Sequence, residues 1–198
     1  SQEEYDFLNQ SIIMGVDAHD NGVDLPVKGV CTYSHLISNF APIEHQPEKA
    51  VQDAAFMEAM AFAIRHLDRL MERRNYILSF QSIVQMAMDA NSNVLLFDQP
   101  IPWMDAFFAL GGEEHSALFV IMPSGSHWKL RGIPPNAKDK MQVRLSLPSK
   151  WAGLSNGDLK KASGISGALF CHKGRFFSLW ETKEDALKAL DYCLKEKR

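Results

Sequence analysis

Apolar positions in the first half of the chain recur at helical spacing. From the acidic start "SQEEYDF" onward they fall three or four residues apart until Asn21-Gly22, a pair that commonly ends a helix. A second run, residues 48–90, contains neither Pro nor Gly, and its apolar face is Phe56, Met60, Ala63, Leu67 and Leu70. Because globular helices usually span about 8–20 residues, we favour two consecutive helices bending near Asn75 over one continuous helix.

After residue 92 short apolar runs alternate with turn signals. Gly125-Ser126 is a two-residue hairpin signal, and Thr182 three residues before Asp185 is a variant of the helix capping box. The predicted strands are 94–98, 117–124, 127–135, 141–148, 168–173 and 175–181, and the predicted helices are 102–111, 156–164 and 182–198. The sequence therefore predicts an α+β protein with a helical segment, 1–92, and an α+β lobe, 93–198, built on a mainly antiparallel sheet.

The composition is that of a globular protein. Of its 198 residues 46% are hydrophobic, and no apolar run reaches the roughly 20 residues that a membrane helix needs. A formal net charge of -3 provides no overall attraction to nucleic acid, so such binding would need a local basic face. The three cysteines are widely spaced and no signal peptide opens the chain, so a reducing, cytoplasmic location is expected.

The stretch "DAHDNG" (17–22) holds several metal-binding side chains. It does not form a calcium-binding EF-hand loop, because His19 occupies the third position and Lys28 the position of the bidentate Glu. Asp17 and Asp20, with His19, remain candidates for a site holding Mn²⁺, Zn²⁺ or Mg²⁺ together with ligands from elsewhere. The local sequence alone favours the alternative, an ordinary helix cap and turn.

A second unusual segment is "ASGISGALFCHKGRF" (162–176). Close-set glycines before a strand let the backbone approach a ligand, and exposed N–H groups in such a turn can bind an anion. The candidate substrate-binding residues are Ser163, Gly164, Gly167, His172, Lys173 and Arg175. The alternative is a tight helix–strand turn with a surface histidine. Cys171, within an apolar strand, is interpreted as a core residue and not as a nucleophile.

Four segments, in the same order along the chain, resemble one known family. They are "DAHDNG" (17–22), "WKLRGIPP" (128–135), "LP.KWAGL" (147–154) and "KWAGLSNGDLKKASGISGALFCHKGRFFSLWETKEDALKAL" (150–190). The first fits an Asp-x-x-Asp-Asn-Gly element, and the last resembles the C-terminal signature of the melanocyte-proliferating-gene family. These proteins are metal-dependent hydrolases related to the DHH phosphoesterases.

The resemblance implies a divalent-metal phosphodiesterase, with Mn²⁺ or Mg²⁺ as the metal and a 3′–5′ exonuclease activity on RNA. The main metal ligands of the family lie in an N-terminal "THxGxFHxDE" element and a later Asp-His-His, and neither occurs here. We therefore expect the C-terminal portion of a longer enzyme, inactive alone, with its catalytic residues in the missing domain. Asp17 would be a last metal ligand, and Asp20 a second ligand or an orienting neighbour.

Within this resemblance, Ser163 to His172 would belong to a lobe that binds a single-stranded nucleic acid or nucleotide. Leu179 stands where relatives usually have glycine, which changes how a substrate would approach. Partners other than the substrate would be the N-terminal catalytic domain and, through the apolar helix faces, a second copy of the chain. The alternative function is a non-catalytic ligand-binding or assembly module from a truncated paralogue.

Overall fold

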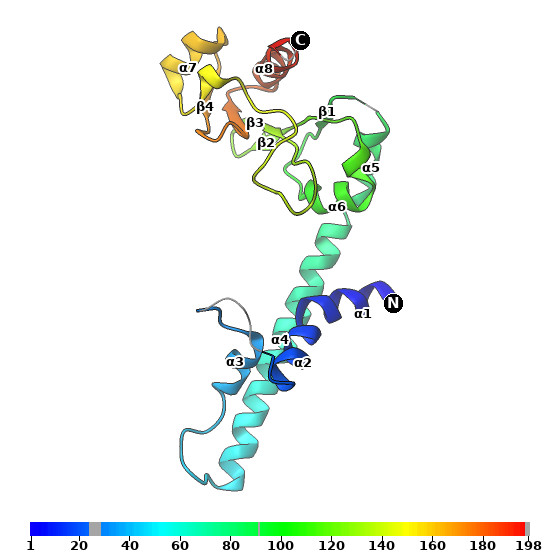
Figure 1. Ribbon diagram of the computed structural model, residues 1–198, viewed down its shortest axis with the longest axis vertical. Helices are drawn as coiled ribbons and strands as arrows, with labels where there is room; N and C mark the ends of the chain where they lie inside the picture. Colours follow the sequence, from blue (N-terminus) through cyan, green and yellow to red (C-terminus); the bar gives the residue numbers. More distant parts are fainter. Residues whose placement is uncertain (24–28, 91, 197–198) are drawn as a thin grey trace. The chain divides into compact units, whose positions relative to one another are not determined.

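The computed structural model describes residues 1–23, 29–90 and 92–196 and shows an α+β protein (Figure 1). Helices precede a five-stranded sheet that is mainly antiparallel, so the predicted fold class is confirmed. The chain forms two compact units, Ser1–Glu72 and Arg73–Arg198. No helix in the described ranges is long and apolar enough to cross a membrane.

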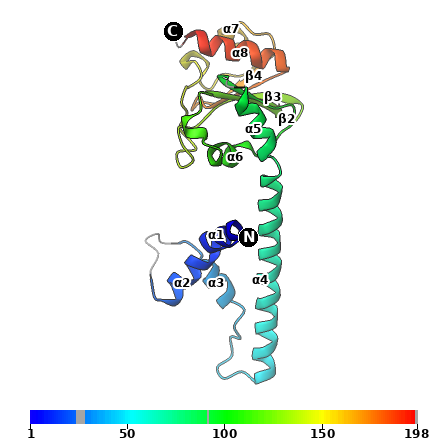
Figure 2. The ribbon, with the colours of Figure 1, turned by 90° about the vertical axis from the view of Figure 1, so that its right-hand side faces the viewer.

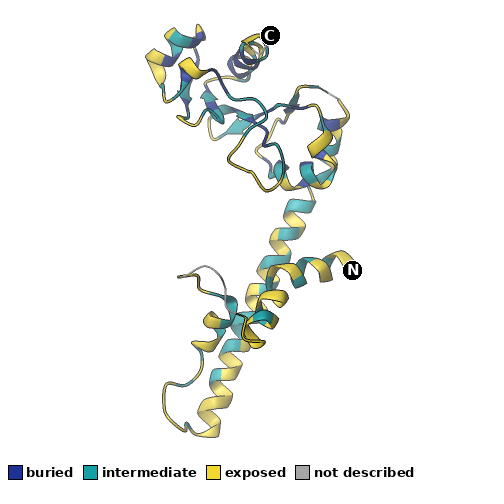
Figure 3. Ribbon diagram, viewed as in Figure 1, coloured by how far each residue is buried: buried dark blue, intermediate teal, exposed yellow. Residues whose placement is uncertain are grey.

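The first unit consists of helices. α1 (Gln2–Leu8) continues through a π-helical turn, Asn9–Ile13, into α2 (Met14–Asp20), which ends before Asn21-Gly22 as predicted. α3 (Tyr33–Ser38) and most of α4 (Lys49–Leu78) follow. None of the described residues of Ser1–Glu72 is buried, whereas the second unit contains buried positions throughout (Figure 3).

The long helical run is broken, as predicted. α4 ends at Leu78 and α5 (Gln81–Asp89) begins after a turn at Ser79-Phe80, a few residues beyond Asn75. The break allows α5 to bury Val84 and Met88 in the second unit. The units divide after Glu72, earlier than the predicted boundary near residue 92, because α5 packs with α6 (Trp103–Ala109).

The strands follow the order β1-β2-β3-β5-β4 across the sheet. β1 (Val94–Leu96) pairs in parallel with β2 (Phe119–Ser124), and every other pair is antiparallel. β2 and β3 (His127–Gly132) form the predicted hairpin around Gly125-Ser126. β4 (Ala168–Cys171) and β5 (Phe177–Trp180) pair as a second hairpin, also as predicted.

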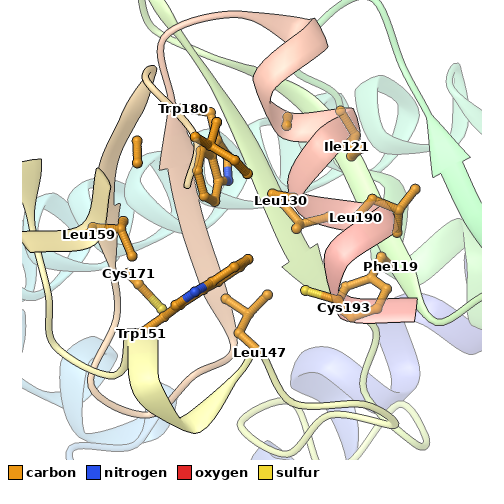
Figure 4. Close-up of a cluster of buried hydrophobic side chains, with 14 residues drawn as sticks. Phe119, Ile121, Leu130, Leu147, Trp151, Leu159, Cys171, Trp180, Leu190 and Cys193 are labelled. Atoms are coloured by element: carbon orange, nitrogen blue, oxygen red, sulfur yellow. The ribbon is translucent and has the colours of Figure 1, made fainter. Parts of the chain in front are cut away.

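Two hydrophobic clusters lie on opposite faces of the sheet. Figure 2 shows α8 (Lys183–Glu196) over one face and α5 and α6 on the other side. The α8 cluster includes Trp151 and Trp180, whose ring centroids are 5.6 Å apart (Figure 4). α7 (Asn156–Ser163) adds Leu159 to it. The second cluster joins α5 and α6 to β1 and β2, so it leaves β4 and β5 without a covering helix on that face.

The predicted strand 141–148 is wrong, because this segment is irregular. Leu145 and Leu147 of this segment pack in the α8 cluster, whereas the side chain of Arg144, which precedes them, binds neighbouring loops. Arg144 donates to five backbone carbonyls, those of Pro134 (3.1 Å), His115 (2.6 Å), Ala117 (3.0 Å), Gly112 (2.6 Å) and Glu113 (3.1 Å). Arg144 therefore holds several loops together through these hydrogen bonds, and the segment around it is not a strand.

Candidate functional site

Asp17 and Asp20 lie one turn apart at the C-terminal end of α2, and both side chains are exposed. The backbone N–H and the side-chain amide of Asn21 both donate to the carbonyl oxygen of Asp17, at 3.0 and 2.8 Å. The predicted helix cap is therefore present. Because the cap uses only the main chain of Asp17, both carboxylates remain available, and within the described residues neither one has an ion-pair or hydrogen-bond partner.

These two carboxylates are oxygen donors of the kind that Mn²⁺ and Mg²⁺ prefer. They are too few to form a site, since no group of three or more His, Cys, Asp or Glu suited to a metal occurs among residues 1–23, 29–90 and 92–196. His19, the third candidate, is exposed and its ring meets that of His35 edge-on at 5.3 Å. Asp17 and Asp20 fit a metal only as part of a larger ligand set.

The turn after α7 uses most of its polar groups internally. Ser163 is buried; its hydroxyl donates to the carbonyl of Leu159 at 2.7 Å and accepts from the N–H of Ile165 at 3.2 Å. Gly164 ends the helix in the left-handed conformation, φ +73°, which favours glycine. A Cβ on Gly167 would overlap the Asp185 carboxylate. These three residues shape the turn, and the hydroxyl of Ser163 is not free for a ligand.

The turn between β4 and β5 brings three predicted residues together. His172 Nδ1 accepts from the N–H of Gly174 at 2.9 Å, so its Nε2 is the nitrogen left for a ligand. Lys173 is exposed, and Arg175 has a left-handed backbone, φ +57°. Arg175 makes one long contact, 3.5 Å from its Nη1 to the carbonyl of Leu147. Two cations and an imidazole therefore share one short turn.

Two cations on the adjacent strand were not singled out from the sequence. Lys129 and Arg131 lie on β3, which pairs with β5, and they contact Phe177 and Phe176 respectively. The alternation in "HWKLRG" (127–132) places both on one face of a strand and was the available signal. That face became relevant only once β5 was known to lie beside β3.

The buried cysteines are not candidates for nucleophilic chemistry. Burial raises the pKa of Cys171 to about 11, against a smaller opposing effect of Arg175. Burial is also the main cause that raises the pKa of Cys193 to about 12. Because the thiolate is the reactive form, both thiols are inert near neutral pH. The interpretation of Cys171 as a core residue is confirmed.

The fold and these residues define an α+β protein with an acidic helix end in one unit and a basic hairpin turn in the other. A family model described as "Uncharacterised protein family (UPF0160)", named MYG1_exonuc, matches residues 2–194. The chain therefore belongs to this family, and the predicted resemblance is confirmed. No solved structure gives a significant match.

Similar proteins occur in bacteria and in animals. The chain is 42% identical over 198 residues to a "MYG1 protein" of Chlamydia trachomatis, which covers all of this chain and 68% of that protein. It is 44% identical over 195 residues to one of Chlamydia pneumoniae, 98% of this chain and 67% of that protein. A "MYG1 exonuclease" of Rattus norvegicus is 28% identical over 201 residues, 92% of this chain and 52% of that protein. The chain thus spans about two thirds of the bacterial relatives and about half of the rat protein.

Proposed function

We propose that this chain is part of a divalent-metal-dependent phosphodiesterase, a 3′–5′ exonuclease acting on RNA. It supplies one wall of the metal site and the lobe that holds the substrate. The observation that carries the proposal is the pair of carboxylates of Asp17 and Asp20, which have no ion-pair partner among the described residues, in a family whose rat member is named an exonuclease. The remaining metal ligands belong to a catalytic domain outside the described residues.

Asp17 and Asp20 would hold Mn²⁺ or Mg²⁺ from one side. The metal, when bound, lowers the pKa of a coordinated water and neutralises charge on the phosphate. The protein's part at this wall is to hold the carboxylates at fixed positions. α2 does so because Asn21 closes the helix on the Asp17 carbonyl, 2.8 Å from its side-chain amide, and fixes the last turn.

The β4–β5 turn would hold the substrate phosphates. Lys173 is a mobile point charge and Arg175 presents a planar set of donors, so together they suit a phosphodiester backbone. Because Nδ1 of His172 accepts from the Gly174 N–H, the proton of the neutral ring is on Nε2, which is the nitrogen that would donate to a substrate phosphate. Gly164 and Gly167 contribute by shaping the turn that leads into β4, and Ser163 by capping α7.

The test is Asp17→Asn in the complete protein encoded by the gene. We expect Mn²⁺-dependent hydrolysis of a 3′-labelled single-stranded RNA to fall by at least a hundredfold, because the neutral amide is a poor metal ligand. The fold should be unchanged, since the Asn21 cap uses only the main chain of Asp17. Circular dichroism and thermal unfolding check the fold, and denaturing gels resolve the products.

A matched control is Asp53→Asn, an exposed carboxylate on α4. Its rate of hydrolysis should equal that of the wild type. Near-normal turnover by Asp17→Asn would refute the ligand assignment. Degradation that begins at the 5′ end, or an activity unaffected by a chelator, would refute the exonuclease direction or the metal dependence.

One observation favours the alternative, a non-catalytic assembly module. The first unit exposes large apolar side chains, among them Ile43 at 103% and Phe56 at 65% of their full accessible area. Such a surface is typical of a segment that packs against another chain or domain. If the complete protein hydrolyses no RNA with Mn²⁺ or Mg²⁺ yet forms a stable dimer or complex through this unit, the assembly function replaces the enzymatic one.

A further inference from the structure

One half of the sheet has a face that no helix covers. Paired residues on neighbouring strands share a face, and Val120, which faces α5 and α6, pairs with Arg131. Arg131 in turn pairs with Phe177, and Lys129 with Leu179. The side chains of Lys129, Arg131, Phe177 and Leu179 therefore lie on the face of the sheet that carries α5 and α6. They belong to β3 and β5, whereas α5 and α6 cover β1 and β2.

Aromatic rings are gathered on and beside this face. Phe177 lies 5.7 Å from Phe170 and 5.1 Å from Phe176, measured between ring centroids. The ring of His172 stacks on Phe177 at 5.4 Å with an interplanar angle of 27°. All four rings are half-buried and not enclosed, so each keeps some surface in contact with solvent. We call Lys129, Arg131, Phe170, His172, Phe176 and Phe177 the open sheet face.

Two cations border the rings. Lys129 Nζ is 5.8 Å from the centroid of Phe177, and the Arg131 guanidinium carbon is 5.9 Å from that of Phe176. Within the described part of the chain neither makes an ion pair, and the side chain of Arg131 makes one long hydrogen bond there, 3.4 Å from its Nη2 to the carbonyl of Lys140. Arg131 Nε is buried without a partner, and burial lowers the pKa of this guanidinium. An anion brought to this face would supply the ion-pair partner that both cations lack among the described residues.

We propose that the open sheet face binds single-stranded nucleic acid, with bases stacked on the aromatic rings and phosphates contacting Lys129 and Arg131. The combination of half-buried rings and cations that form no ion pair among the described residues fits this ligand, because every base has a face to stack and every linkage carries a negative charge. Paired bases are already stacked within a duplex, so the site selects single strands. The proposal rests on the nucleic-acid substrate of the proposed function, and it adds Lys129, Arg131 and the phenylalanine rings to the residues that would hold this substrate.

A protein partner fits this surface less well. An apolar partner would bury Lys129 and Arg131 without compensation, which costs free energy. An acidic peptide would satisfy the two cations, but its Asp and Glu side chains have no aromatic face to stack on the rings. A polynucleotide satisfies both sets of groups along one strand.

The experiment measures equilibrium binding of the 198-residue chain to a fluorescein-labelled, unstructured single-stranded RNA by fluorescence anisotropy. EDTA is present throughout, so that no metal-dependent hydrolysis contributes. We expect Phe177→Leu, which keeps apolar bulk but removes the flat ring, to weaken binding roughly five- to a hundredfold. Lys129→Gln should reduce the magnitude of the slope of log Kd against log salt concentration by about one.

Matched controls lie on the opposite, α8 side of the sheet. Tyr192→Leu removes a half-buried aromatic ring and Lys195→Gln an exposed cation, both from α8. Both variants should bind RNA as the wild type does, and all four should keep the wild-type circular dichroism spectrum. Lys129→Gln keeps the test decisive if Phe177→Leu fails to fold.

Three results would overturn the proposal: no binding by the wild type, equal losses in the α8 controls, or equal affinity for a duplex of the same sequence. If the complete protein is inactive but the 198-residue chain still binds single strands through this face, the proposed hydrolysis is refuted and the binding surface is not. If the complete protein is active but the Phe177 and Lys129 variants bind RNA normally, the binding role of the open sheet face is refuted and the proposed hydrolysis is not.

Discussion

At the scale of single residues, glycine at 167 has a structural explanation. Gly167 precedes β4 and lies against the start of α8. A Cβ at this position would overlap the carboxylate of Asp185 and lie 3.2 Å from Cβ of Glu181. Asp185 is itself buried; its N–H donates to the Thr182 hydroxyl at 3.1 Å, and its Oδ2 accepts from that hydroxyl at 2.8 Å. A side chain at position 167 would have to displace this hydrogen-bonded carboxylate.

We therefore predict that Gly167→Ala lowers the free energy of unfolding by about 1–3 kcal/mol, the usual cost of overpacking. Gly157→Ala is the matched control, because no heavy atom lies within 4 Å of its added Cβ and the site is on helix α7. It should be neutral or stabilising by up to about 1 kcal/mol. Urea denaturation followed by tryptophan fluorescence measures both, and equal stabilities of the two variants would contradict the packing argument.

At the scale of elements, the segment after β3 is held by one side chain. The Arg144 guanidinium donates to carbonyls in the turn after α6, in the loop that leads to β2 and, through its Nε, to the carbonyl of Pro134 after β3. Its guanidinium carbon also lies 5.5 Å from the ring centroid of Phe107. Burial lowers the pKa of Arg144, while Glu113 and Glu114 oppose this effect.

We predict that Arg144→Met lowers the free energy of unfolding by roughly 3 kcal/mol, because it leaves several carbonyls without donors. Arg144→Lys should recover only part of this loss, since an ammonium group cannot reproduce the planar set of donors. Lys138→Met, an exposed cation in the same segment, should change stability by no more than about 0.5 kcal/mol. Chemical denaturation compares the three, and a full rescue by lysine would show that charge alone matters.

The elements also show how far the sequence could be interpreted. Helices α1, α2 and α8 and both hairpins follow from periodicity and turn residues, which act within a few positions of the chain. The same reasoning wrongly predicted a strand at 141–148, because alternation of polar and apolar residues does not distinguish a strand from a loop with an inward-pointing arginine. The carbonyls that Arg144 binds lie up to 32 positions away, at Gly112.

At the scale of the whole molecule, the two compact units differ in how much they bury. Among the described residues every buried side chain lies at or beyond Val84, in the unit Arg73–Arg198. The unit Ser1–Glu72 places Phe56, Met57 and Ile64 on α4 at 65%, 55% and 50% exposure. Burial of apolar surface is the main source of stability, so the two units should not be equally stable in the isolated chain.

We predict that amide hydrogen exchange in the isolated chain is faster in α1, α2 and α3 than in β2, β3 and α8 by at least two orders of magnitude. The reason is that none of the described residues of the first unit is fully buried, so local opening there exposes less new apolar surface than opening of the sheet, which exposes both clusters. Mass spectrometry of peptides after timed deuterium labelling measures this difference. Comparable protection in both units would mean that the first unit is stabilised by contacts other than buried side chains.

The candidate site divides in the same way between local and distant information. "DAHDNG" and the basic turn His172, Lys173 and Arg175 could be selected from the sequence, because each is a short run with unusual chemistry. The partners of Lys129 and Arg131 could not, because they lie near residue 176, some 45 positions further along the chain. The same limit applies to Ser163. Its hydroxyl suggested a ligand contact, but in the structure the residue is buried and the hydroxyl caps the end of α7.

By itself the sequence determined the α+β class, most helices and strands, the break in the long helix and the family, since these depend on residue spacing and on short motifs. Only the tertiary structure decided which polar groups remain available. It assigned Ser163, Gly167 and Arg144 to packing and hydrogen bonding, and it left the carboxylates of Asp17 and Asp20 and the cations Lys129 and Arg131 without an ion pair among the described residues. The physical reason is that a polar group is available to a ligand only if no neighbour in the folded protein already binds it. These neighbours come from distant parts of the chain, and the periodicity of the sequence does not indicate which they are.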